Sequence, residues 1–561
     1  MKNVLTLPVV FQNNMILQRQ KPIRIWGAGP ARSVVRAVLN GAEASGAAGE
    51  DGAWELRLPP MEASTGGSLA LFCNGEPACL FENAALGEVW IAGGQSNMEF
   101  ALRYDRRRRE VFRRPPDPLL RYFEVPKRSW EEQREGDPFT GGNFAAQGIW
   151  LHFSRKNAPL FSAAAYYFAA RLREKLGPHV PVGIISCSWS GSPAFAWIGE
   201  EDLRAGGELA RFWTEYYDRI QTLDPAAYGE AYAKVQAEGR SPLMRAAFDL
   251  YMRGRIPIWM GDALKKIDPG FFDLQLEGPR DPWRPCGLYA AMLSAIAGYA
   301  CRGVIWYQGE GDDVRPEYYA RLFSLVVRCW RRAWGDELPF IFAQLTAFER
   351  DHFQRGDSFP ELRRQQELAA DTIPLAWMVC TMDLGERYNI HPGSKGPVGE
   401  RLAAAALANV YGFDIPWRSP RVTGAADAGG GVRIRFDGCD GGLLIRGGLR
   451  QSLKLFSRNG EIRRFEARAE GDALVVKPGG TGGPPVVEIC YASEPYTKAN
   501  LFNAAGFPAL PFRLTALPPA DPQAGPGSLW RREKLSECPN SNENTGSRKK
   551  GSVPNVMPRK G

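Results

Sequence analysis

The sequence has few of the residues and segments on which several classes of protein depend. Its 561 residues include only four histidines. No apolar run reaches the ~18 residues that a membrane-spanning helix requires, so we expect no membrane partner. The ten cysteines include no C-x-x-C pair, which argues against zinc ribbons and agrees with a reducing compartment.

The N-terminus has no pattern typical of a secretory signal peptide. One basic residue, Lys2, precedes an apolar patch that Pro8 interrupts, and no A-x-A-like cleavage site follows. Together with the cysteine usage, this favours a cytoplasmic protein.

The formal net charge of +8 is concentrated at one end of the chain. Residues 531–561 hold eight Lys or Arg and three Asp or Glu, which leaves +3 for the preceding 530 residues. Because positive and negative charges nearly cancel over these 530 residues, they have no obvious basic surface for nucleic-acid phosphates, and we expect no nucleic-acid partner. The tail, residues 517–561, is basic and rich in Pro, Ser, Asn and Gly, which predicts disorder.

The order of apolar segments predicts three folded units, because the chain is too long for one hydrophobic core. Residues 1–84 alternate apolar and polar in short runs between turn signals, which predicts a β-sandwich-like domain. Residues 85–416 alternate strands and helices, which predicts a three-layer α/β domain. Within it, residues 200–280 resemble a helical insert over the site. Residues 417–516 return to short strands and predict a second β domain.

A candidate nucleophile follows a predicted buried strand. The apolar run from Glu88 to Gly93 leads into Gly94-Gln95-Ser96-Asn97-Met98. A small, Gly-flanked serine at such a strand end lies where an α/β sheet exposes reactive groups, so Ser96 could act as a nucleophile. The alternative is a plain strand-to-helix turn that Ser96 caps.

A serine nucleophile needs a base, usually histidine. His391 lies on a loop after the apolar strand 375–380 and before an amphipathic helix, which suits a catalytic role. The alternative is that His391 merely caps that helix. His152, His179 and His352 occupy ordinary loop, edge or charged positions.

Two further buried strands end in residues that could hold an oxyanion. One runs into Gly191, whose backbone N–H is a candidate donor, and the other runs into Gln308, whose side-chain amide is another. Each segment alone is a weak signal, since Gly-rich turns end many strands. Four strand endings in the order Ser, Gly, Gln, His form a much stronger constellation.

The chain resembles the sialate O-acetylesterases, members of the SGNH hydrolase superfamily. The resemblance rests on residues 94–99, 188–193, 306–310 and 390–392 with Lys395. It implies an SGNH-type parallel-sheet hydrolase domain flanked by N- and C-terminal β domains. It also implies an acyl-enzyme on Ser96, proton transfer by His391 and an oxyanion held by the Ser96 and Gly191 amides and the Gln308 side chain. No metal or cofactor is needed for this chemistry.

The sequence departs from many relatives at two positions. Asn389 stands where they carry Asp two residues before the histidine, and Ser190 stands where they carry Gly. The triad acid therefore stays open. Asp383 is the first choice, Glu386 and Glu310 are rivals, and a Ser–His dyad is a further alternative.

The resemblance implies a carbohydrate O-acetylesterase whose substrate is an acetylated sugar, 9-O-acetylated sialic acid first. An acetyl-xylan or other acetyl-glycan esterase is the alternative, and a non-catalytic carbohydrate-binding protein is less favoured. A lipase-like esterase is also less favoured, because no long apolar lid segment is present. The run Arg106–Arg109 could pair with a substrate carboxylate, although a solvated helix face is the favoured interpretation.

Overall fold

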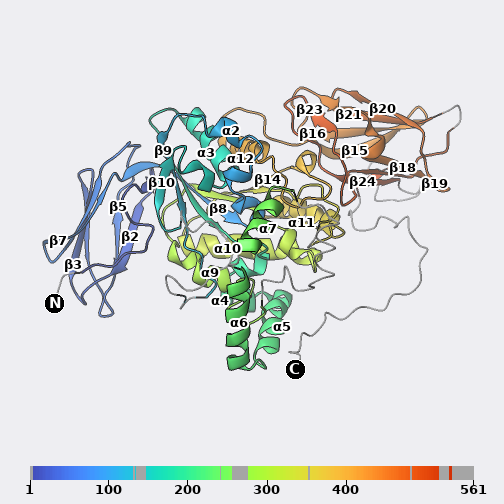
Figure 1. Ribbon diagram of the computed structural model, residues 1–561. Helices are drawn as coiled ribbons and strands as arrows, with labels where there is room; N and C mark the ends of the chain where they lie inside the picture. Colours follow the sequence, from blue (N-terminus) through green and yellow to red (C-terminus); the bar gives the residue numbers. More distant parts are fainter. Residues whose placement is uncertain are drawn as a thin grey trace.

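The computed structural model has a central α/β region flanked by two regions of β-strands (Figure 1). The N-terminal strands lie on one side of it and the C-terminal strands on the other. Every helix within the described ranges is too short or too polar to span a bilayer. The structure describes residues 4–130, 133, 147–239, 242–255, 276–351, 354–479, 483–516 and 530–532.

An eight-stranded sheet forms the centre of the molecule. Seven strands follow one another in the order β10 (Trp150–Phe153), β9 (Asp117–Glu124), β11 (Val182–Ser188), β8 (Ala85–Gly94), β12 (Gly303–Tyr307), β13 (Phe340–Ala343) and β14 (Ala376–Val379). The eighth strand, β1 (Ile16–Gln18), pairs with the start of β8. Neighbours run parallel except that β10 is antiparallel to β9. The prediction of an α/β fold is confirmed, and its parallel sheet is corrected at one edge, where antiparallel strands are common.

Helices cover both faces of this sheet (Figure 1). Alternate residues of β8 point to opposite sides, so Val89 and Ile91 join one apolar cluster while Trp90 and Ala92 join another. The first cluster includes α10 (Tyr319–Trp334) and α11 (Phe359–Thr372). The second includes α3 (Ala163–Leu176) and α12 (Gly396–Asn409). Burial on both faces explains why every residue of β8 is buried.

The segment between β11 and β12 is largely helical. It forms α4 (Glu200–Arg204), α5 (Ala210–Ile220), α6 (Pro225–Gly239), α7 (Pro242–Met252) and α9 (Gly287–Ala291). In Figure 1, α5 and α6 project away from the sheet, whereas α7 lies beside the central region. Residues 256–275 of the predicted insert lie outside the described residues.

The N-terminal strands form two antiparallel sheets. One pairs β2 (Ile23–Ala28) with β5 (Ala53–Leu58), and the other has the order β4 (Ala42–Ala47), β3 (Val34–Leu39), β6 (Ser68–Cys73) and β7 (Glu76–Glu82). Asn40-Gly41 and Asn74-Gly75 join two of the hairpins, and all four residues have positive φ. Two-residue hairpin turns require that conformation, which Asn and Gly adopt most readily.

The C-terminal strands build three further sheets around their own apolar cluster. The first has the order β15 (Arg421–Ala428), β16 (Gly431–Asp437), β21 (Ala473–Pro478) and β20 (Phe465–Glu470). The second pairs β17 (Leu443–Ile445) with β23 (Leu501–Asn503). The third has the order β19 (Gly460–Glu461), β18 (Leu453–Ser457), β22 (Glu488–Tyr491), β24 (Phe512–Ala516) and β25 (Trp530–Arg532).

Strand β25 corrects part of the predicted disordered tail. It pairs with β24 and buries Trp530, and Arg532 forms an ion pair with Glu367 at 2.5 Å. Burial of a tryptophan and a ladder of backbone hydrogen bonds offset the entropy that this short segment loses. The rest of residues 517–561 lies outside the described residues.

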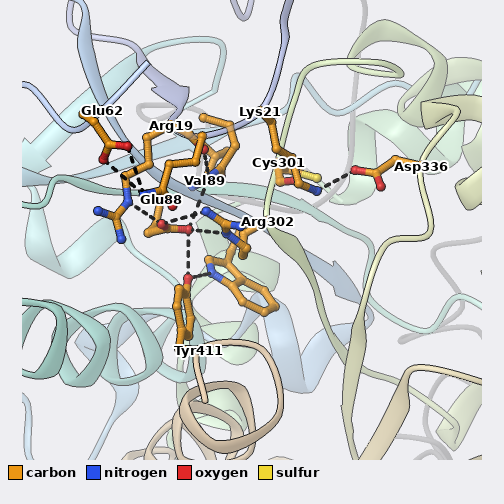
Figure 2. Close-up of polar contacts among 12 residues, drawn as sticks. Arg19, Lys21, Glu62, Glu88, Val89, Cys301, Arg302, Asp336 and Tyr411 are labelled. Carbon is orange, nitrogen blue, oxygen red and sulfur yellow. Dashed lines mark hydrogen bonds and ion pairs between the residues drawn. The ribbon is translucent and has the colours of Figure 1, made fainter. Parts of the chain in front are cut away.

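A buried charge cluster fixes the amino end of β8 (Figure 2). The carboxylate of Glu88 is fully buried and binds Arg19 at 2.6 Å and Arg302 at 2.7 Å. It also accepts a hydrogen bond of 2.9 Å from the hydroxyl of Tyr411, just beyond α12. Burial alone would raise the pKa of Glu88, and the two guanidinium groups bring it below its usual value. The cluster ties β1, β8, β12 and α12 together at the edge opposite the carboxyl ends of the strands.

Candidate active site

The carboxyl ends of β8, β11 and β12 meet at one edge, because Gly94 is in register with both Ser188 and Tyr307. Gly94 has φ +129°, and a Cβ there would lie 2.2 Å from the carbonyl oxygen of Tyr307. Only glycine allows this close approach. The chain then turns into α1 (Ser96–Glu99), so Ser96 lies at the sheet edge.

Ser96 does not cap α1. The N-cap position belongs to Gln95, and no side chain makes a capping hydrogen bond there. The capping alternative is therefore wrong. Ser96 is 6% exposed, and within the described part of the chain its hydroxyl makes no hydrogen bond. The hydroxyl is thus available to a substrate or a base.

His391 is the buried histidine among those that the structure describes. It is 6% exposed and packs edge-on against the ring of Tyr251, with ring centroids 5.3 Å apart. Its Nδ1 is buried and has no hydrogen-bond partner among the described residues. Burial and, secondarily, the charge of Lys395 lower the pKa of His391 to about 3, so the imidazole is neutral and able to accept a proton. His152 and His179 are exposed, and His352 lies outside the described residues.

One side chain joins the segments that carry Ser96 and His391. The amide nitrogen of Asn97 donates to the carbonyl oxygen of Ile390 at 3.0 Å and to Oε1 of Glu310 at 2.5 Å. The residues that these two contacts join are 293 and 213 positions apart in the sequence. The structure therefore brings together the neighbour of the predicted nucleophile, the neighbour of the predicted base and one of the candidate acids.

The candidate acids differ in what they contact. Asp383 forms a two-pronged ion pair with Arg401 of α12, with distances of 2.6 and 2.7 Å. Glu386 accepts from Arg106 at 2.7 Å and from the amide nitrogen of Asn389 at 3.1 Å. None of the described hydrogen bonds joins either carboxylate to the His391 ring.

Glu310 is the candidate acid with an unused oxygen. It begins a short helical turn after β12 and is 4% exposed. Its Oε2 is buried and, like Nδ1 of His391, has no hydrogen-bond partner among the described residues, so these two atoms do not bond to each other in this structure. Burial raises the pKa of Glu310 above its usual value. Its other oxygen, Oε1, accepts from the amide nitrogen of Asn97, which also donates to the carbonyl oxygen of Ile390, the residue before His391.

The turn that carries Gly191 is held from two sides. The backbone nitrogen and hydroxyl of Ser190 donate to the Glu99 carboxylate at 2.9 and 3.0 Å. Nε1 of Trp283 donates to the carbonyl oxygen of Ser190 at 2.9 Å. Gly191 has φ +74°, and a Cβ on it would lie 2.1 Å from the Trp283 ring. The turn thus requires glycine at the position of the predicted oxyanion donor.

Gln308 is fully buried beneath this turn, and its contacts differ from the predicted role. Its amide nitrogen donates to the carbonyl oxygen of Ser192 at 3.1 Å and to Asp312 at 2.5 Å. Because both partners are acceptors, they use both amide hydrogens, and none is left for an oxyanion. Asp312 also accepts from the backbone nitrogen of Ala194 at 3.1 Å. The pair therefore braces the turn, which corrects the expectation that Gln308 donates to the oxyanion.

The comparisons with known proteins agree with an esterase. The family model described as carbohydrate esterase, sialic acid-specific acetylesterase matches residues 281–408. The sialate O-acetylesterase of Rattus norvegicus is 25% identical over 439 residues, which are 71% of this chain and 72% of that protein. The sialate O-acetylesterase of Homo sapiens is 22% identical over 436 residues, 71% of this chain and 70% of that protein. A solved carbohydrate acetylesterase from Xanthomonas citri is 27% identical, with a TM-score of 0.68 over 91% of this chain and 99% of that chain.

This chain is a carboxylic ester hydrolase related to the sialate O-acetylesterases. The resemblance expected from the motifs is thereby confirmed. The family match includes Gln308, Asp383 and His391, whereas Ser96 and Gly191 precede it.

Several residues of this esterase that organise the site were not given a role from the sequence. Gln95 accepts from the backbone nitrogens of Gly309 at 3.2 Å and Gly311 at 3.0 Å, which links the first and third motifs. Asn97, Glu99 and Lys395 make the contacts described above and below. All four residues lie inside or beside the motifs of the resemblance, and this position in the sequence is the signal that could have identified them.

The arginine run of the esterase lies in and before α2 (Arg108–Val111) and has acidic partners. Arg106 binds Glu386 at 2.7 Å and Arg107 binds Glu400 at 3.0 Å. Arg106 is 65% exposed in its side chain. These contacts agree with the solvated interpretation. Among the described residues, no three His, Cys, Asp or Glu side chains are arranged to hold a metal ion.

Proposed function

We propose that the chain removes O-acetyl groups from sialic acid, with a preference for the 9-O position, through an acyl-enzyme on Ser96. The observation that carries this proposal is the contact of Asn97 with Ile390, which sets the segment of Ser96 against that of the buried, neutral His391. A hydroxyl next to a neutral imidazole is the requirement for nucleophilic catalysis by serine.

In the proposed reaction the hydroxyl oxygen of Ser96 attacks the acetyl carbonyl while His391 takes its proton. The resulting oxyanion accepts from the backbone N–H groups of Ser96 and Gly191, each worth about 2.7–4 kcal/mol of transition-state stabilisation. His391 then returns the proton to the sugar oxygen, which leaves as a free hydroxyl. A water molecule, deprotonated by His391, then attacks the acetyl-serine; the bond to the Ser96 oxygen breaks, acetate leaves, and His391 returns the proton to that oxygen.

We propose Glu310, rather than Asp383, as the group that orients His391. Both carboxylate oxygens of Asp383 are used by Arg401, whereas Oε2 of Glu310 and Nδ1 of His391 are both buried and without described partners. A carboxylate at this position would hold the imidazole tautomer and stabilise the imidazolium that forms. Asp383 stays the alternative.

The substrate is proposed from the relatives, two of which are named sialate O-acetylesterases and one a carbohydrate acetylesterase. The test is acetate release from 9-O-acetylated sialic acid, 4-O-acetylated sialic acid and acetylated xylo-oligosaccharides at equal concentration. The proposal expects the highest kcat/KM for the 9-O-acetylated sugar. A higher value for the xylo-oligosaccharides would assign the enzyme to the acetyl-xylan alternative.

We also propose that the central sheet with its helices is an SGNH-type hydrolase domain, residues 85–416, with β domains at 1–84 and 417–516. Its support is the apolar cluster of the C-terminal strands, to which the central region adds Ala347, Cys380 and Met382, whereas the strands before residue 84 share one apolar cluster with the central region. Limited proteolysis tests this division, because cleavage should concentrate near the two boundaries. A cytoplasmic location stays a prediction, which fractionation of cells that express the chain would test.

A further inference from the structure

We propose that Lys395 and Asn97 are a positioning pair that fixes the loop of His391 against Ser96 and keeps His391 in its neutral form in acid. The inference rests on the proposed Ser96–His391 chemistry. It assigns a role to a buried cation that the reaction itself does not consume.

Lys395 is buried in the site. It lies just before α12 with 0% exposure, and its Nζ donates to Oδ1 of Asn97 at 2.5 Å. The ammonium lies 4.7 Å from the ring centroid of Phe100 and 5.6 Å from that of Tyr307. Its backbone nitrogen donates to Asp105 at 2.9 Å. Lys395 forms no salt bridge within the described residues, so Asn97 is its hydrogen-bonding side chain.

This contact determines how the amide of Asn97 is oriented. An ammonium group only donates, so the amide oxygen must face Lys395 and the amide nitrogen must face the other way. The nitrogen then has two acceptors, the carbonyl oxygen of Ile390 and Oε1 of Glu310. Lys395 thereby fixes the one side chain that connects the nucleophile segment with the base segment and the buried carboxylate.

The charge of Lys395 also acts on His391. Burial lowers the pKa of Lys395 to about 7, while Glu310, Glu386 and Asp105 oppose that effect. The ammonium is therefore charged at the pH at which an ordinary imidazole, of pKa about 6.5, would bind a proton. A nearby positive charge disfavours protonation of His391, as burial does.

The other groups around this pair do not reverse the effect. The neutral ring of Tyr251 from α7 faces His391, and Asn389 binds only its backbone, at 3.0 Å on each side. Glu386 is paired with Arg106, and Asp105 accepts from the hydroxyl of Tyr167 of α3 at 2.9 Å. Glu310 contacts the same Asn97, and burial raises its pKa, so acid removes its charge at a higher pH than that of an ordinary carboxylate.

The test compares the pH dependence of kcat/KM for a soluble aryl acetate in wild type, Lys395→Met and Lys395→Arg. We expect Lys395→Met to lower kcat and to move the acid limb of the profile upward by about 1 pH unit or more. Lys395→Arg keeps the charge and should leave the acid limb near its wild-type position. An unchanged acid limb in Lys395→Met would overturn the electrostatic role.

A matched control removes another buried cation far from the site. Arg121 is 1% exposed and donates to backbone oxygens of Asn14 and Asn83 at 2.9 and 2.7 Å. Arg121→Met should lower the melting temperature without moving the acid limb. If Lys395→Met does not fold, Asn97→Ala replaces it, with kcat expected to fall at least 10-fold while the acid limb stays in place. An Asn97→Ala enzyme with wild-type kcat would overturn the positioning role.

Ser96→Ala separates this inference from the proposed function. If the wild-type enzyme turns over and Ser96→Ala does not, the proposed chemistry holds, and the Lys395 and Asn97 variants test the inference alone. If Ser96→Ala keeps wild-type turnover, the proposed chemistry fails and the inference fails with it.

Discussion

Replacing Gly191 by alanine tests whether the turn after β11 builds the oxyanion site. At φ +74° an alanine is strained by about 1–2 kcal/mol. Its Cβ would also lie 2.1 Å from the Trp283 ring, so either the ring or the backbone must move. If the Gly191 N–H leaves its position, the lost donor costs about 2.7–4 kcal/mol of transition-state stabilisation, a 10²–10³-fold fall in kcat. KM should change little, because the oxyanion forms only in the transition state.

The assay is steady-state hydrolysis of an aryl acetate together with thermal unfolding. Gly412→Ala is the matched control, since Gly412 also has φ +74° but a Cβ added there would meet no atom within 4 Å, and it lies beyond the end of α12. It should lose only the stability that the backbone strain costs, about 1–2 kcal/mol, and keep wild-type kcat. A Gly191→Ala enzyme with kcat within about 3-fold of wild type would refute the assignment of Gly191 as an oxyanion donor.

Three further predictions concern buried or paired charges. Glu310→Gln should lower kcat at least 100-fold with little loss of stability. Asp383→Asn should mainly destabilise the fold, by about 3 kcal/mol, because it leaves the charge of Arg401 unpaired. Kinetics and denaturant unfolding measure both effects, and the reverse result would restore Asp383 as the acid. The imidazole of His391 should stay neutral until the pH approaches its pKa of about 3, and a titration midpoint near pH 6.5 by NMR would show an unperturbed imidazole; kcat/KM should begin to fall at higher pH, where Glu310, whose pKa burial raises, takes up a proton. Glu88→Ala should destabilise the protein by about 3–5 kcal/mol in denaturant unfolding, and a loss under 1 kcal/mol would show that its two arginines find other partners.

Much of the fold could be predicted from local patterns. Apart from Glu88, the strand β8 is apolar because both of its faces are covered, and Asn40-Gly41 marks a hairpin because that turn needs positive φ. The antiparallel direction of β10 could not be predicted, since apolar spacing carries no information about strand direction. Nor could β25, whose stability comes from pairing with β24 rather than from its own composition.

The site was predictable in outline and not in its contacts. Ser96, Gly191 and His391 follow strands whose ends are recognisable, so their place at the sheet edge follows from the fold. The contacts of Gln308 with Ser192 and of Lys395 with Asn97 span 116 and 298 residues, and no local pattern specifies such pairs. The nearness of Asp383 to His391 in sequence favours it as the acid, but in the structure Arg401 of α12 binds both of its carboxylate oxygens.

The most direct test of the central claim is acetate release from 9-O-acetylated sialic acid by wild type and Ser96→Ala, with both proteins shown to unfold at the same temperature. Ser96 is 6% exposed and its hydroxyl makes no hydrogen bond within the described residues, so its removal should leave stability unchanged. The account predicts saturable release by wild type and none above background by Ser96→Ala. Equal release by both proteins would contradict it.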